Sequence, residues 1–311
     1  MTDLQVRKMR FGFADYDVPF LWNETNPGFS AMANAVSFLA VAFEKMITAM
    51  IPEAKPLIKD PAVLEEADAF VRQEGQHSMA HRQHVKGLIR SYPALKETFD
   101  DVVASFDDLT KNTPLKYRLA YTADLEATFT PVFKLMLDND DTLFAPGDDR
   151  VASLFLWHFV EEVEHRSSAL IIYNDVVADP FYRVKVVRSV FKHVLGMVRM
   201  AAEGFNKHIP LEVRKVDAMS TFATYRYKKV LLERLPFVAR PPDNGPVDNP
   251  FAQLPARQQL AAVTGIVRSQ LPNHDPAHEK LPALAGEWFA RYDDGYDVTN
   301  WYTAANEDSH A

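Results

Sequence analysis

Two stretches of the sequence place glutamate and histidine at helical spacing. The first, residues 70–88, has one Glu and three His at intervals of three, four and three, namely Glu74, His77, His81 and His84. The second, residues 157–168, contains His158, Glu161, Glu162 and His165. Because successive residues of an α-helix turn by about 100°, each set falls on one stripe of a helix. Both stretches contain Glu-x-x-His, with which facing helices of a bundle hold a pair of metal ions.

Two further glutamates complete such a site. Glu44 and Glu126 each lie among apolar residues within a segment that we expect to be helical. Carboxylates bridge and neutralise divalent ions, and one histidine for each ion adds a nitrogen donor that suits iron or manganese. We therefore predict metal ligands on four helices, namely Glu44, Glu74, His77, Glu126, His158, Glu162 and His165.

The spacing leaves several roles open. Glu161 lies one turn before His165, so the helical stripe does not decide whether Glu161 or Glu162 is the ligand. His81 can be an additional ligand or a hydrogen-bond partner of a ligand. His84 can be such a partner or lie at the surface. Glu164 points about 120° away from the stripe, which predicts an outer or solvent-facing position. For Glu44 and Glu126, a simple salt bridge is the alternative to metal binding.

The composition excludes several kinds of site. The chain has no cysteine, which removes disulfides, iron–sulfur clusters and thiolate zinc sites and leaves nitrogen and oxygen ligands. The formal net charge of −8, without a basic patch among aromatics, predicts no nucleic-acid partner. Residues 1–20 have no apolar segment typical of a secretory signal. Polar residues interrupt the longest apolar run, residues 29–50, so we expect a cytoplasmic protein without a membrane span.

Pairs of a capping residue and proline mark the expected helix starts, at residues 26–27, 60–61, 113–114 and 179–180. The expected long helices cover residues 27–50, 61–90, 115–138 and about 150–177. A short acidic helix is expected within 93–113, and two further helices at 181–208 and 211–235. The ligand pattern on the four long helices predicts an all-α fold, a ferritin-like four-helix bundle with additional C-terminal helices.

The chain divides into three expected parts. Residues 1–26 form an N-terminal arm, and residues 27–210 form the ferritin-like di-metal bundle. Residues 211–311 contain an additional helix, a proline-rich linker and a C-terminal extension with amphipathic patches at 258–269 and 281–292. Trp288 and Trp301 predict that this extension packs on the bundle or on a second copy of the chain, as in a homodimer.

The sequences RQEGQHSMAHRQH (72–84) and WHFVEEVEHR (157–166) resemble the signature stretches of the family labelled "predicted metal-dependent hydrolase", within the ferritin-like superfamily. The resemblance covers about residues 20–205. It implies ligands at Glu74, His77, Glu162 and His165 and, on a weaker match, at Glu44 and Glu126. The position of His158 is also similar to that of an extra ligand in di-iron arylamine N-oxygenases.

These observations predict first a non-haem di-iron oxidase or oxygenase that binds two iron ions. Its partners would be O2, a small and largely apolar substrate, and a separate electron donor or reductase. Phe38, Phe129, Phe133 and Trp157 are candidate walls for the substrate, although their spacing also suits a plain core. The alternative is an iron, manganese or zinc hydrolase of an ester, amide or phosphoester. A third hypothesis is a non-catalytic iron-binding protein.

Overall fold

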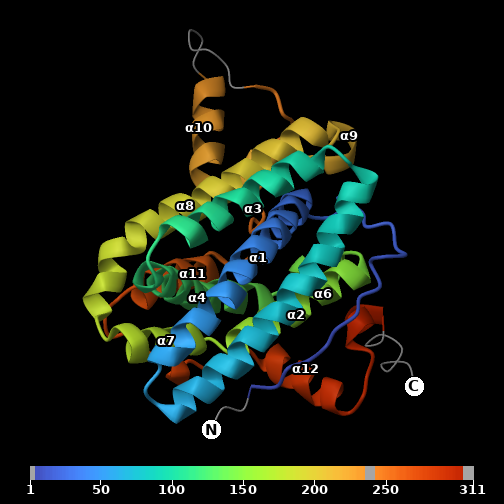
Figure 1. The fold of residues 1–311 in the computed structure, drawn as a ribbon. Helices are drawn as coiled ribbons and strands as arrows, with labels where there is room; N and C mark the ends of the chain where they lie inside the picture. Colours follow the sequence, from blue (N-terminus) through green and yellow to red (C-terminus); the bar gives the residue numbers. More distant parts are fainter. Residues whose placement is uncertain (1–3, 235–241, 304–311) are drawn as a thin grey trace.

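The computed structural model describes residues 4–234 and 242–303, and all regular structure within them is helical (Figure 1). This confirms the all-α prediction. Four long helices carry the candidate ligands. They are α1 (Pro27–Ala54), α2 (Pro61–Ser91), α4 (Leu115–Leu137) and α6 (Asp149–Glu164). Each packs on two of the others, in the order α1, α2, α6, α4 and back to α1, so they enclose one common interior.

The helix starts follow from local chemistry. The side chains of Asn26, Asp60 and Asp179 each accept a hydrogen bond from a backbone N–H in the first turn, and a proline follows each of them. Asp148 caps α6 in the same way. These contacts satisfy N–H groups that have no partner within the helix. At α4, Pro114 occupies the cap position that was expected for Thr113.

The fourth expected helix is two helices, which corrects the prediction of a single element to residue 177. α6 ends at Glu164, His165 has non-helical backbone angles (φ −92°, ψ 17°), and α7 (Ser168–Val177) follows. The guanidinium of Arg166 donates to the carbonyl oxygens of Val163 at 2.8 Å and of Pro276 at 2.9 Å. The ending is therefore stabilised by a contact with the C-terminal extension.

One helix was expected over residues 211–235, but the part that the structure describes, 211–234, is divided. It forms α9 (Leu211–Arg214), a 3-10 turn (Ala218–Thr221) and α10 (Ala223–Glu233). The turn is organised by the buried carboxylate of Asp217, which accepts hydrogen bonds from Asn206, Tyr225 and Lys229. These three side-chain donors, together with the backbone N–H of Met219, converge on one carboxylate and favour this compact turn over a continuous helix.

Helices outside the four cover the bundle. α3 (Leu95–Asn112) is a full 18-residue helix rather than a short connection, and it packs on α1 and α8 (Pro180–His208). A short helix, α5 (Asp140–Leu143), lies in the connection between α4 and α6. α8 is basic on its exposed side, but Arg183 is buried and pairs with Asp124 at 2.8 Å.

The N-terminal arm and the C-terminal extension both pack on the bundle. Phe11, Phe13 and Trp22 of the arm are buried in the same core cluster as Trp288 and Trp301 of the extension. α11 (Ala256–Ser269) packs on α4, and α12 (Ala283–Asp293) packs on α6. The extension therefore covers its own bundle. The division into three parts, at residues 26 and 210, stays a prediction.

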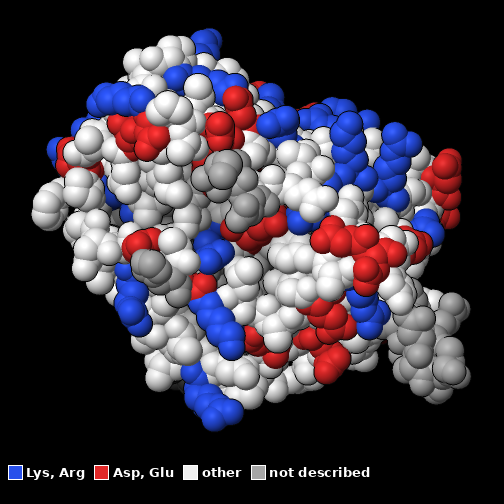
Figure 2. Space-filling view, turned by 90° about the horizontal axis from the view of Figure 1, so that it is seen from below, with Lys and Arg blue, Asp and Glu red and all other residues white. Residues whose placement is uncertain are grey.

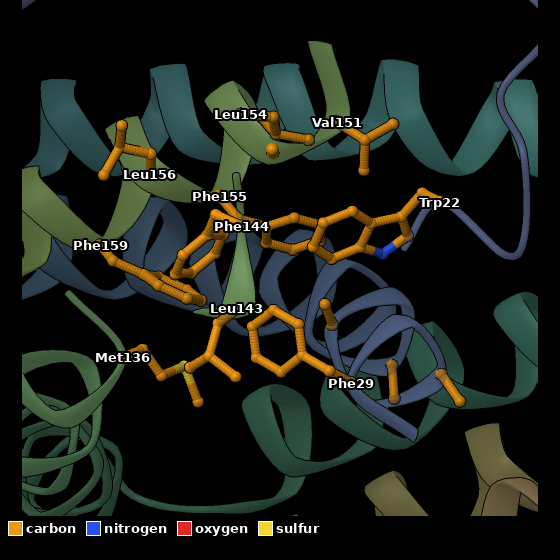
Figure 3. Close-up of a cluster of buried hydrophobic side chains, with 14 of the residues drawn as sticks. Trp22, Phe29, Met136, Leu143, Phe144, Val151, Leu154, Phe155, Leu156 and Phe159 are labelled. Carbon is orange, nitrogen blue, oxygen red and sulfur yellow. The ribbon is translucent and has the colours of Figure 1, made fainter. Parts of the chain in front are cut away.

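An aromatic cluster joins the arm and Phe144, which follows α5, to α1 and α6. Figure 3 shows the rings of Trp22, Phe29, Phe144, Phe155 and Phe159 lying together, and all five are at most 2 % exposed. Such rings bury large apolar areas and contribute strongly to core stability. The cluster reaches the candidate ligands, because Phe155 and Phe159 contact histidine rings of the site.

Among the described residues, one segment, 27–57, is long and apolar enough to cross a membrane, and 67 % of its apolar window is buried inside the protein. This burial, together with the 2 % exposure of Glu44, is typical of the core helix of a soluble protein. On the face shown in Figure 2, basic and acidic side chains are both spread over the surface. The cytoplasmic location stays a prediction.

Candidate metal centre

The predicted ligands meet in the interior of the four-helix bundle. They form two groups, and within each group four ligand atoms lie within 4.8 Å of one another. The first group is Glu44, His77, His158 and Glu162, and the second is Glu74, Glu126, Glu162 and His165. All seven side chains are at most 3 % exposed. The structure thus brings together every residue of the predicted ligand set.

Glu162 belongs to both groups. Its Oε1 lies 2.9 Å from His158 Nε2 and 3.6 Å from His77 Nδ1, whereas its Oε2 lies 3.3 Å from His165 Nε2. One carboxylate oxygen therefore faces each group. A carboxylate in this position could donate one oxygen to an ion in each group.

Glu161, the alternative ligand, belongs to neither group. Its Oε2 accepts a hydrogen bond from His77 Nε2 at 2.8 Å, and its Oε1 accepts one from Arg7 at 3.0 Å. Because the carboxylate of Glu161 accepts a proton of His77 at Nε2, Nδ1 is the nitrogen that faces the first group. Burial lowers the pKa of His77, but the hydrogen bonds to Glu161 and Glu162 outweigh burial and hold this pKa well above 6.5, so a bound ion would displace a proton from Nδ1. Glu161 thus orients the candidate ligand His77 without being part of either ligand group.

Gln73 does the same for the second group. Its Oε1 lies 3.0 Å from His165 Nδ1 and accepts the proton there, so the Nε2 lone pair of His165 faces Glu74 at 3.2 Å. Gln73 was not among the predicted site residues. A glutamine beside a Glu-x-x-His motif has no distinctive spacing, so the sequence contains no signal for this role.

A chain of hydrogen bonds supports His158. His158 Nδ1 lies 2.7 Å from His81 Nε2, His81 Nδ1 lies 2.8 Å from Ser37 Oγ, and Ser37 Oγ lies 2.9 Å from His84 Nδ1. Burial lowers the pKa of His158 to about 4 and of His84 to about 3, and it holds the pKa of His81 well below 6.5. All three are therefore neutral at pH 7. His81 and His84 thus stand behind His158, and neither is at the surface.

Burial and neighbouring charges shift the pKa values of the carboxylates in the two groups. Burial raises the pKa of Glu44, Glu74 and Glu126 well above 4.5, and the nearby Glu162 raises these pKa values further. Burial acts in the same direction on Glu162, but His165 and His158 outweigh it and hold its pKa well below 4.5. Four ionised carboxylates carry four negative charges, which two divalent cations would neutralise.

The residues fit such ions, because most of the atoms that face the two groups have no hydrogen-bond partner among the residues that the structure describes. Buried polar atoms without a hydrogen-bond partner occur in several parts of the described structure, but eight of them lie together here, namely Glu44 Oε2, both oxygens of Glu74 and Glu126, Glu162 Oε2, His77 Nδ1 and His165 Nε2. Buried polar atoms in proteins nearly always have partners. A concentration of unpartnered carboxylate oxygens and imidazole nitrogens is the donor set of a divalent metal site.

The salt-bridge alternatives for the two outer glutamates do not describe the structure. Lys45 pairs at the surface with Asp107, at 2.6 Å, and not with Glu44. The buried cation Arg183 pairs with Asp124, two residues before Glu126 in the sequence, and not with Glu126. Both glutamates are left facing the histidines of the site.

The aromatic residues that were predicted to line a substrate site fall into two sets. The ring of Trp157 lies 5.0 Å from that of His77, and Phe133 lies 6.1 Å from His158 and stacks on Phe129. Trp157 and Phe133 therefore contact the two histidines of the first group. Phe38 instead packs on Phe99 and Phe205, so its contacts are those of the core.

Comparison with protein families gives one result that covers most of the chain. The family model described as "Predicted metal-dependent hydrolase" matches residues 5–240, which include residues 5–26 of the arm and every candidate ligand. A search of curated proteins and a search of solved structures gave no match. The likenesses to ferritin-like proteins and to arylamine N-oxygenases therefore stay expectations. The extent of the family match shows that this chain belongs to the predicted metal-dependent hydrolases.

Proposed function

We propose that this protein is a two-metal hydrolase of a small ester, amide or phosphoester. The observation that carries the proposal is the position of Glu162, whose two oxygens face two separate groups of ligands. The family description adds support for metal-dependent hydrolysis. It favours this alternative over the oxygen-activating function that the ligand pattern led us to expect first.

Each group of four residues would hold one ion. When bound, such ions lower the pKa of a water molecule and polarise the carbonyl or phosphoryl group that it attacks. The chain itself fixes the donors: Glu161 holds the proton of His77 at Nε2, and Gln73 holds that of His165 at Nδ1. Trp157 and Phe133 are buried against the two histidines of the first group and exclude bulk water there, which strengthens electrostatic interactions within the site.

The burial of the site restricts the substrate. Every candidate ligand is at most 3 % exposed. A substrate must therefore be small, or it must be admitted by movement of the arm or the extension that covers the bundle. This restriction favours small esters, amides and phosphoesters over polymeric substrates.

The second candidate is the di-iron oxidase or oxygenase. The observation that favours it is the donor set of carboxylates and imidazoles without cysteine, which also suits two iron ions. This function would require O2 and a separate electron donor. Both candidates use the same ligands, and they differ in the metal and in the reaction.

The two candidates are separated by assays of the full chain reloaded with one metal at a time. After chelation, the protein would receive Zn²⁺, Mn²⁺ or, without oxygen, Fe²⁺, and p-nitrophenyl esters, anilides and phosphodiesters would be tested. We expect hydrolysis that the chelator abolishes and the metal restores. Absence of hydrolysis with every metal, combined with O2 consumption by the Fe²⁺ form, would contradict the hydrolase proposal and support the second candidate.

A further inference from the structure

Arg7 of the N-terminal arm is a buried cation next to the candidate metal centre. Its side chain is 4 % exposed, and its Nη1 lies 3.0 Å from Glu161 Oε1. The guanidinium also binds Glu164 through two hydrogen bonds, from Nη1 at 2.9 Å and from Nη2 at 3.1 Å. Such a two-pronged contact fixes the orientation of both partners, because the donors of a guanidinium are coplanar.

Through these carboxylates Arg7 is linked to a histidine of each ligand group. Glu161 accepts the Nε2 proton of His77, of the first group. Glu164 Oε2 accepts a hydrogen bond from Gln73 Nε2 at 2.8 Å, and Gln73 Oε1 accepts the Nδ1 proton of His165, of the second group. One guanidinium thus stands behind the outer nitrogen atoms of two histidines that face different metal positions.

The C-terminal extension covers the other side of Arg7. Its guanidinium carbon lies 4.5 Å from the ring centre of Phe289, 5.6 Å from that of Tyr292 and 5.8 Å from that of Trp288. Figure 1 shows the arm passing beside α12, from which all three rings come. A guanidinium is attracted to aromatic faces and shielded by them from water. α12 therefore holds the cation in place against Glu161 and Glu164.

α12 lies outside residues 5–240, the part of the chain that matches the family. We propose that Arg7, clamped by α12, is a positioning residue that fixes His77 and His165 for metal binding, so that the C-terminal extension determines metal affinity. This inference rests on the proposed two-metal site. Its physical basis is that outer hydrogen bonds orient metal-binding histidines and commonly change metal affinity by about 10- to 100-fold.

The test compares metal affinity among variants of the full chain. Zn²⁺ affinity would be measured by competition with a chromophoric chelator, and ligand geometry by the visible absorption spectrum of the Co²⁺-loaded protein. We expect Arg7→Ala to weaken Zn²⁺ binding by about 10- to 100-fold and to shift the Co²⁺ bands. Phe289→Leu should weaken binding less, because it removes one aromatic face and leaves both carboxylate contacts.

Arg291→Ala is the matched control. Arg291 lies on the same helix and its guanidinium also covers an aromatic ring, that of Trp301 at 4.7 Å, but it forms its ion pair with Glu287. We expect this variant to keep wild-type affinity and spectrum. If Arg7→Ala does not fold, Arg7→Lys replaces it, because lysine keeps the charge and loses the two-pronged contact.

The outcomes separate this inference from the proposed function. If the wild-type protein binds two ions and the Arg7 variant binds them with unchanged affinity and spectrum, the positioning role is wrong and the two-metal site stands. The positioning role would also be wrong if the Arg7 variant kept its metal affinity but its metal-free form unfolded at a lower temperature. Arg7 would then stabilise the fold without affecting the metal site. If the wild-type protein binds no ions, the proposed function itself fails, and the inference with it.

Discussion

Replacing Glu162 with alanine is expected to reduce bound metal from two ions per chain to nearly none. Glu162 faces both ligand groups, through Oε1 on one side and Oε2 on the other. Its loss therefore removes a donor from each ion and the negative charge shared between them. The measurement is metal content by mass spectrometry after loading the full chain with Zn²⁺ or Mn²⁺ and removing weakly bound metal.

Two single variants provide the matched controls. Glu44 belongs to the first group only and Glu126 to the second only, and both are as buried as Glu162. Glu44→Ala and Glu126→Ala should each lose about one ion and keep the other. Equal losses in all three variants would contradict the shared position of Glu162, because a bridging ligand must affect both ions.

Glu74→Gln is expected to stabilise the metal-free protein at neutral pH while it weakens metal binding. Burial raises the pKa of Glu74 in the folded state well above its ordinary value of 4.5. Below pH 4.5 this carboxyl is protonated in both states and resembles glutamine. As the pH rises above 4.5, Glu74 ionises in the unfolded chain while it stays protonated in the folded protein. The wild-type protein therefore loses stability relative to the variant. The loss is about 1.4 kcal/mol for each unit by which folding raises the pKa.

The measurement is urea unfolding of both proteins with chelator at several pH values. The difference in the free energy of unfolding should be small near pH 4 and increase toward pH 7. Glu97→Gln is the control, because Glu97 is exposed and pairs with Lys207 at the surface. A stability difference for Glu74→Gln that does not change with pH would contradict the electrostatic strain inferred for the site.

The parts of this protein that the sequence predicts are those encoded by local spacing. Glu74 and His77 share a stripe of α2 because residues three apart face the same side of any α-helix. The caps at Asn26 and Asp60 are equally local, since each binds an N–H two or three residues later. The four ligand helices and the predicted ligands on them could therefore be found without the structure.

The choice between Glu161 and Glu162 depends on residues far along the chain. Both glutamates are buried on α6, but Glu161 is bound by Arg7, which lies 154 residues away in the sequence. The break at His165 likewise depends on Arg166, whose guanidinium binds a carbonyl of the C-terminal extension. Helical spacing contains no information about such partners. These features required the tertiary structure.

The spacing of the ligands also does not determine which reaction the site catalyses. Carboxylates and imidazoles at these spacings suit iron, manganese and zinc, and the same ligands serve oxygen chemistry and hydrolysis. The spacing therefore predicts a metal site without choosing its reaction. The family description favours hydrolysis, and O2 activation stays the second candidate.

The central claim is that Glu162 lies between two metal ions. Anomalous diffraction from crystals of the full chain grown with Zn²⁺ or Mn²⁺ tests it most directly. We expect two anomalous peaks, one on each side of the Glu162 carboxylate, with His77 and His158 at the first and His165 at the second. A single peak, or no peak among these residues, would contradict the two-metal site.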